Sequence, residues 1–191
     1  MAGIVDVANE FSEFSEFLNI ERREHMKCIA SLNNGFEGWI KLEFFLWLIA
    51  KHKLEVEEDD IGLEYKVHLD QRRSEMDKNR KQCDLWIQNH DNTGYHYVEL
   101  KVPFSNYNSG KMFTSAGHDF WYMSRISASS EYAVTGNAII IGVGFDNKGW
   151  QSGIDRVRNE AWLPESWCPS ASGMFDSEGR VRWAIFTKKY T

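Results

Sequence analysis

Three charged residues near the middle of the chain could together bind a metal ion and act on a phosphodiester bond. Asp84 lies in one apolar segment, Glu99 and Lys101 lie in the next, and the polar run 90–94 between the segments is typical of a hairpin loop. Because side chains alternate along a strand, Glu99 and Lys101 share one face of their segment. The pattern therefore predicts an antiparallel hairpin that brings the three charged side chains together.

The chemistry expected of this hairpin is that of a hard divalent cation. Two carboxylates about 4 Å apart repel each other by roughly 4 kcal/mol at an effective dielectric constant of about 20, so Asp84 and Glu99 need a counter-charge. Mg²⁺ prefers oxygen ligands and keeps several waters, so these carboxylates and the backbone carbonyl of Leu100 would suffice. The ion would polarise a phosphoryl oxygen, while Lys101 orients a water or neutralises charge on phosphate. The alternative is a surface hairpin in which Glu99 and Lys101 form a solvated pair.

A third carboxylate is expected on a helix predicted for residues 36–52. At about 100° per residue, Glu43 has six apolar neighbours within about 60° on the helix surface. These are Phe36, Trp39, Ile40, Leu46, Trp47 and Ala50. Glu37 lies about 120° from Glu43, so at most one of them can face the metal, and the apolar surroundings favour Glu43. A buried carboxylate needs a cation or a donor, so the alternative role for Glu43 is a structural ion pair with a lysine or an arginine.

The order of these residues resembles that of the PD-(D/E)XK nuclease superfamily: a helical glutamate, an aspartate that opens a strand, then Glu-Leu-Lys. The resemblance covers the middle of the chain, and Cys83 stands where the family has a proline. It implies an α/β (mixed α+β) fold with a restriction endonuclease-like αβββαβ core. It also implies that Glu43, Asp84 and Glu99 bind Mg²⁺ or Mn²⁺, and that Lys101 is catalytic.

The other segments fit this succession of elements. Residues 62–69 alternate as a first strand, residues 105–110 are typical of a loop, and residues 137–145 form an apolar strand that is covered on both faces. Helices are expected at about 116–128 and 150–162, and residues 181–187 predict a late edge strand. Residues 5–32 predict a helix that is broken or extended near Asn19. We expect one domain over residues 1–191, with 1–35 as a helical extension packed on a nuclease-like core, 36–191.

Composition excludes several other classes of protein. The 191 residues are 42% hydrophobic, which is enough for a core without disulfides. The first residues lack the pattern of a signal peptide, and no segment is long enough to span a bilayer, so we expect a cytoplasmic protein without a membrane partner. Three isolated cysteines and six histidines show no zinc spacing, and no dinucleotide loop, Walker motif or nucleophile elbow is present.

The net charge of −6 argues against a protein that coats nucleic acid, but a local basic patch is compatible with a nuclease. Basic residues are concentrated in the connection that leads to Asp84, and two further candidates follow Lys101. The candidate nucleic-acid contacts are Arg72, Arg73, Lys78, Arg80, Lys81, Tyr107 and Lys111. The alternative for the basic residues is an ordinary solvated loop.

The sequence thus predicts a Mg²⁺-dependent or Mn²⁺-dependent endonuclease, with DNA favoured over RNA as its substrate. Cleavage of both strands of a duplex would suit a homodimer. Two other classes stay open: a catalytically inactive protein of the same fold that binds nucleic acid or a partner protein, and an acidic interaction protein such as a phage or bacterial defence-related inhibitor.

Overall fold

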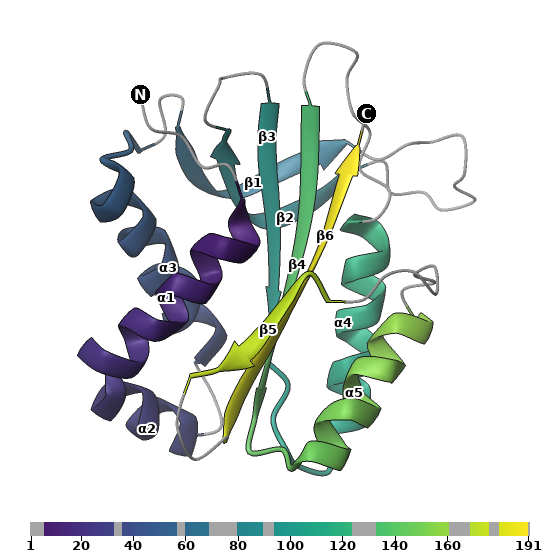
Figure 1. The fold of residues 1–191 in the computed structure, drawn as a ribbon. Helices are drawn as coiled ribbons and strands as arrows, with labels where there is room; N and C mark the ends of the chain where they lie inside the picture. Colours follow the sequence, from purple (N-terminus) through teal and green to yellow (C-terminus); the bar gives the residue numbers. More distant parts are fainter. Residues whose placement is uncertain are drawn as a thin grey trace.

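The fold is described from a computed structural model over residues 6–32, 36–56, 60–68, 80–89, 94–123, 133–160, 169–175 and 180–190. It is a mixed α/β arrangement in which helices cover both faces of a six-stranded sheet (Figure 1). The helices are α1 (Val7–Glu21), α2 (Arg23–Ser31), α3 (Phe36–His52), α4 (Ser109–Met123) and α5 (Asn147–Glu160). The strands are β1 (Ile61–His68), β2 (Arg80–Gln88), β3 (Gly94–Lys101), β4 (Ala133–Val143), β5 (Ala171–Met174) and β6 (Val181–Tyr190).

The strand order is β1-β2-β3-β4-β6-β5. The predicted hairpin is confirmed, because β2 and β3 are antiparallel with Leu85 opposite Val98. Strand β3 then pairs in parallel with β4, and α4 forms the crossover between them. The pairings β1–β2, β4–β6 and β5–β6 are antiparallel. The C-terminal end of β3, which carries Glu99 and Lys101, therefore lies in the middle of the sheet between β2 and β4.

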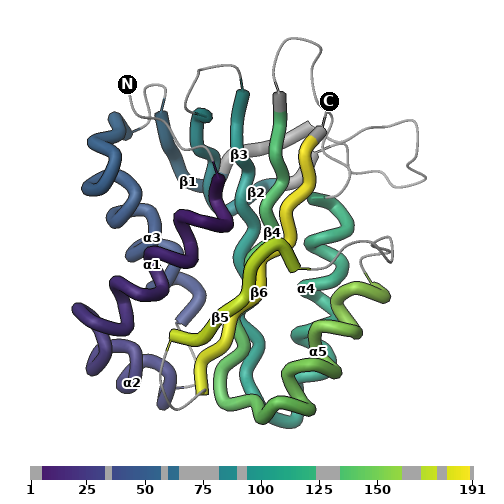
Figure 2. Tube along the Cα trace, viewed as in Figure 1, coloured from purple at the N-terminus to yellow at the C-terminus, as the bar shows by residue number. Residues whose placement is uncertain are grey.

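Alternation along the central strands separates two apolar cores. Val98 and Leu100 of β3 face the helices α1, α2 and α3, together with Ile139 and Ile141 of β4. The opposite face of β4 packs on α4 and α5. The tube in Figure 2 shows the same three layers, with α1 to α3 on one side of the sheet and α4 and α5 on the other. Strand β4 is apolar because both of its faces are buried, as the sequence predicted.

The N-terminal helix α1 is part of the larger core. Phe11 has no exposed surface, and its ring lies 5.1 to 5.8 Å from the rings of Phe14, Phe44, Phe175 and Trp183. The side chain of Asp6 caps the helix by accepting a hydrogen bond from the backbone N–H of Ala8 at 2.9 Å. Helix α1 is thereby fixed against α3 and the β5–β6 side of the sheet.

Several predicted boundaries are corrected by the structure. Helix α4 begins at Ser109, inside the stretch expected to be a loop, and the N-terminal helix is interrupted at Arg22, not Asn19. Strand β6 is not an edge strand, because the short strand β5, which the sequence did not predict, pairs with its outer side. Within the described ranges, no helix has the length and apolar character needed to cross a bilayer.

Candidate metal and phosphate site

Asp84 lies where β2 separates from β3. The regular pairing of the two strands ends at Leu85, and the carboxylate of Asp84 then takes the place of a backbone acceptor. Its Oδ2 accepts a hydrogen bond from the backbone N–H of Leu100 at 2.7 Å. The sequence prediction that Asp84 approaches the Glu99–Lys101 segment is therefore confirmed in position, and the hydrogen bond fixes the orientation of the carboxylate.

The backbone around Asp84 is irregular. Cys83 packs with Met123 on the α4 face, while Leu85, two residues later, belongs to the core under α3. In a regular strand these two side chains would share a face. On the neighbouring strand, Glu64 lies between the pairs that flank Asp84 and has a φ of 58°, which is rare for a residue other than glycine. Both strands are thus distorted at one level of the sheet, and backbone outliers of this kind concentrate at functional sites.

Lys101 is surrounded by carboxylates from three elements. Its Nζ lies 3.1 Å from Glu99 Oε1, 3.5 Å from Asp119 Oδ2 and 3.7 Å from Glu37 Oε1. Glu99 is 3% exposed, so it is a buried carboxylate whose charge Lys101 balances. Asp119 comes from α4 and Glu37 from the first turn of α3. Helices from both layers therefore meet at the end of β3.

The charge state of Lys101 follows from these neighbours. Burial alone would lower the pKa of Lys101, but the negative charges of Glu99, Glu37, Asp119 and Asp84 outweigh it and raise the pKa above its ordinary value. The ammonium group is consequently protonated throughout the neutral range. It can donate hydrogen bonds and stabilise negative charge, but it cannot serve as a general base at neutral pH.

A second lysine, Lys41, contacts the same group of carboxylates from α3. Its Nζ lies 3.3 Å from Asp84 Oδ1 and 3.7 Å from Glu64 Oε1. The two lysines are thus contacted by five carboxylates. Counting only these seven side chains, five negative and two positive charges leave a charge of −3. Excess negative charge in a small volume favours the binding of a cation.

The structure corrects the prediction for the helical glutamate. Glu43 Oε2 lies 3.8 Å from Nε of Arg22, which is the structural ion pair that the sequence left open as its alternative role. The glutamate of α3 that contacts Lys101 is Glu37, and its Oε2 also accepts a hydrogen bond from the backbone N–H of Val102 at 3.3 Å. Glu43 is therefore removed from the candidate site and Glu37 takes its place.

The reason for this correction lies in the composition of α3. Apolar residues surround most of this helix, so apolar neighbours do not identify its buried side. Leu42 and Leu46 are about half exposed, at 49% and 50%, while Phe44 is fully buried. On the helix surface, Glu37 lies about 20° from the direction of Phe44, whereas Glu43 lies about 100° from it.

The sequence also missed Lys41 and Asp119, although a signal existed for each. Lys41 follows Glu37 by four residues, so the two lie on one face of the helix. Asp119 is the only acidic residue of α4. A right-handed crossover places such a helix over the strand that precedes it, and the face of β3 that carries Glu99 and Lys101 is the one that α4 covers.

The structure describes some of the residues that were predicted to contact nucleic acid and not others. Tyr107 is 97% exposed in the turn before α4, and Lys111 is exposed on the first turns of α4. Arg80 and Lys81 belong to strand β2, not to the connection before it. Arg72, Arg73 and Lys78 lie outside the described residues. The basic patch as a whole stays a prediction.

The oxygen donors of this site suit a hard cation with few protein ligands. Among the side chains that the structure describes, no three from histidine, cysteine, aspartate and glutamate converge closely enough to form a metal centre. Mg²⁺, however, needs only one or two carboxylates and completes its shell with water. Asp84 and Glu99, together with the backbone carbonyl of Leu100, are hard oxygen donors of that kind, so the residues present fit Mg²⁺ or Mn²⁺ better than zinc.

Access to Lys101 is provided by a surface pocket of about 230 Å³. Glu37, Lys101 and Asp119 line it together with Val102, Pro103, Met112 and Ser115. Lys101, Glu37 and Asp119 are therefore reached from solvent at the end of β3, where a phosphate could approach, whereas Asp84 and Glu99 are not among the lining residues. Comparison of the chain with protein-family models, with curated proteins and with solved structures gave no match.

Proposed function

We propose that the protein is a Mg²⁺-dependent or Mn²⁺-dependent endonuclease of the PD-(D/E)XK type, with DNA as the favoured substrate. The observation that carries the proposal is the group formed by Asp84, Glu99 and Lys101 at the end of the β2–β3 hairpin, joined by Glu37 from α3. The order of elements from α3 to β4 is helix, three strands, helix, strand, which agrees with the αβββαβ core of that superfamily.

In this proposal Asp84 and Glu99 hold the divalent cation, with the Leu100 carbonyl as a further donor. A bound cation supplies Lewis acidity toward a phosphoryl oxygen and makes a water more acidic. Lys101, protonated at neutral pH, stabilises the charge that develops on the phosphate. Glu37 is a positioning residue, because its carboxylate contacts Lys101 and also holds the backbone N–H of Val102.

A second candidate function is favoured by one specific observation. Lys41 contacts Asp84 at 3.3 Å and Lys101 contacts Glu99 at 3.1 Å, so each of the two proposed metal ligands already has a cationic partner. A protein of the same fold that binds nucleic acid or a partner protein without cleaving could use these ion pairs as purely structural elements. In that case the five carboxylates would not bind a divalent cation.

A cleavage assay separates the two functions. Supercoiled plasmid and labelled single-stranded DNA and RNA are incubated with Mg²⁺, with Mn²⁺ or with EDTA. We expect metal-dependent cutting that falls by about 100-fold or more in Asp84→Asn and in Lys101→Met. The control is Asp155→Asn, which removes a carboxylate from the exposed face of α5 and should leave the rate unchanged. Absence of cutting by the folded protein, together with no calorimetric Mn²⁺ binding that depends on Asp84, would overturn the nuclease proposal in favour of the second function.

A further inference from the structure

A shallow pocket of about 280 Å³ lies on the surface between helices α4 and α5. Five of its lining residues come from α4 and one from α5: Gly110, Lys111, Thr114, Ser115, His118 and Arg156. Four of these side chains, those of Lys111, Ser115, His118 and Arg156, are exposed. A large partner can therefore reach the polar groups of this pocket from solvent.

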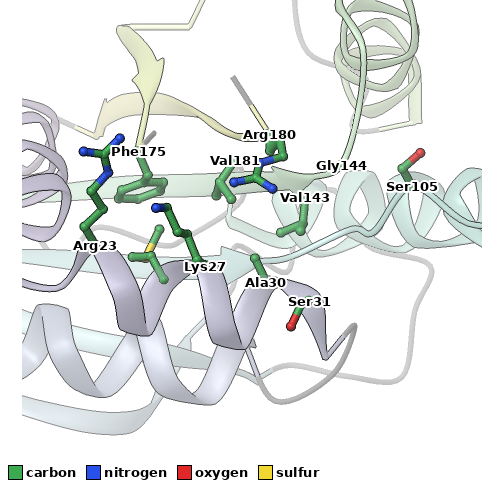
Figure 3. A pocket seen from close by; sticks show the side chains of 11 residues that line it. Arg23, Lys27, Ala30, Ser31, Ser105, Val143, Gly144, Phe175, Arg180 and Val181 are labelled. Carbon is green, nitrogen blue, oxygen red and sulfur yellow. The ribbon is translucent and has the colours of Figure 1, made fainter. Parts of the chain in front are cut away.

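The pocket under helix α2 differs in this respect (Figure 3). Its apolar side chains include Phe175 and Val181, which are 1% and 2% exposed. Lys27, which Figure 3 shows among the lining residues, is paired with Glu24 at 3.0 Å. A charged ligand therefore finds more accessible groups between α4 and α5 than under α2.

The side chains of the α4–α5 pocket carry a positive charge. No carboxylate of the described residues forms an ion pair with Lys111 or Arg156, and Arg156 Nη1 donates to the neutral carbonyl of Gly110 at 3.4 Å. His118 Nε2 lies 3.5 Å from Glu160 Oε2. With His118 neutral, two positive charges and one negative charge leave +1, and protonation of His118 raises this sum to +2.

This pocket adjoins the pocket at Lys101, because Ser115 lines both of them. On α4, Lys111, Ser115 and Asp119 follow one another at intervals of four residues, so they lie along one side of the helix. The distance from Lys111 to Asp119 is about 12 Å along the helix axis. One strand of DNA has a phosphate about every 3.4 Å along its axis, so this length corresponds to about three or four phosphates. A strand with one phosphate at Lys101 can thus bring a neighbouring phosphate to Arg156.

We propose that the surface between α4 and α5 binds the backbone of a nucleic-acid strand beside the phosphate that is cut at Lys101. Lysine and arginine side chains, with hydroxyl groups such as those of Thr114 and Ser115, are the usual partners of backbone phosphates. Such contacts position a strand without reading its bases. The inference rests on the proposed function, because it extends the path of the strand that the candidate site would cleave.

The test measures DNA binding in EDTA, where metal-dependent cleavage does not occur. Fluorescence anisotropy of labelled single-stranded and duplex DNA is recorded from about 50 to about 200 mM salt. We expect Lys111→Gln and Arg156→Gln each to weaken binding about tenfold at the lower salt concentration. Each should also reduce the slope of log affinity against log salt concentration by about one. Ser115→Phe, which narrows the passage between the two pockets without changing charge, should weaken binding and leave the slope unchanged.

The matched control is Lys189→Gln, which removes the same charge from an exposed position on β6. By alternation, Lys189 shares the face of Ile185, which packs in the core with α1 to α3, on the opposite side of the sheet from α4 and α5. Its affinity and slope should equal those of the wild type. Unchanged slopes in Lys111→Gln and Arg156→Gln, equal losses in Lys189→Gln, or no DNA binding by the wild type would each overturn the proposal.

The cleavage assay separates this inference from the proposed function. If the wild type cuts DNA with Mg²⁺, we expect Lys111→Gln to raise KM by about tenfold and to leave kcat unchanged. Cutting by the wild type, with KM and the salt slope unchanged in Lys111→Gln, would overturn the α4–α5 surface alone. A reduced slope in a protein that cuts nothing would support the surface and overturn the nuclease proposal.

Discussion

At the scale of single residues, Glu37 and Glu43 provide a matched pair on one helix. Glu37 contacts Lys101, whereas Glu43 contacts Arg22. We expect Glu37→Gln to lower the rate of metal-dependent cleavage by about 10- to 100-fold, because Lys101 and the Val102 backbone lose a charged partner. Glu43→Gln should change the rate by less than about twofold. The two rates are measured on the same plasmid, and equal losses in both variants would contradict this placement of the helical carboxylate.

Lys101 allows a prediction about pH. Lys101→Met should destabilise the protein by about 1–3 kcal/mol at neutral pH, because the buried Glu99 loses a cationic partner. The pKa of Lys101 is raised in the folded state above its ordinary value of 10.5. The contribution of Lys101 to folding stability is therefore fully present below pH 10.5. It is lost only as the pH rises through the higher pKa that Lys101 has in the folded state.

Urea unfolding of wild type and Lys101→Met at several pH values checks this sign. The difference in unfolding free energy should stay constant from about pH 7 to about pH 9 and shrink only in more alkaline solution. Lys101→Arg, which keeps the charge, should recover part of the lost stability at every pH. A difference that disappears between about pH 7 and about pH 9 would mean that Lys101 loses its proton early and is available as a base.

Physical reasons explain which residues of the site could be predicted from the sequence and which could not. Asp84, Glu99 and Lys101 were predictable because strand alternation and a short hairpin fix both the face and the partner. Glu37 was not predictable, because the sequence of a helix that is apolar nearly all round does not show which of its sides is buried. Asp119 was missed although a signal existed, because its contact with Lys101 depends on how α4, the next element of the chain, packs over β3.

At the scale of elements, the sequence predicted best those helices and strands whose apolar residues repeat most regularly. The bounds of α3, of strand β1 and of the central strands β3 and β4 agree with their patterns to within about four residues. Strand β5 has four residues, three of them small, so it has no local pattern that would predict a strand; in the sheet of the described residues it pairs with β6. For the same reason β6 was misread as an edge strand.

Two glycines test how closely the helices pack. A Cβ on Gly153 of α5 would lie 2.2 Å from the ring of Phe113 on α4, whereas a Cβ on Gly38 of α3 would meet nothing within 4 Å. We expect Gly153→Ala to destabilise the protein by about 1–3 kcal/mol through overpacking. Gly38→Ala should stabilise it by about 0.5–1 kcal/mol, because alanine favours the helix.

The unfolding free energies of both glycine variants are measured in urea under one set of conditions. Because α4 also carries Asp119, Gly153→Ala is expected to disturb the contact with Lys101 and to lower cleavage as well as stability. The expected result is a lower free energy of unfolding for Gly153→Ala and a higher one for Gly38→Ala. A stabilising Gly153→Ala would show that α4 and α5 do not pack as closely as described.

At the scale of the whole molecule, the distribution of charge sets how the protein can meet DNA. The net charge is −6, and the group around Lys41 and Lys101 contributes five carboxylates. A polyanion approaching this site is repelled unless the carboxylates are neutralised. An ordinary basic surface behaves in the opposite way, since added cations screen it and weaken DNA binding.

We therefore expect Mg²⁺ to tighten the binding of DNA. Fluorescence anisotropy with a labelled duplex is measured for Lys101→Met, in which cleavage is suppressed, at constant ionic strength with and without Mg²⁺. Affinity should rise by about tenfold with Mg²⁺, because a bound divalent cation offsets the carboxylates and offers the phosphate a ligand. The rise should vanish when Asp84→Asn is added, because the proposed ligand is lost. If Mg²⁺ weakens binding equally in both proteins, the ion acts only by screening, and the carboxylates are structural partners of Lys41 and Lys101.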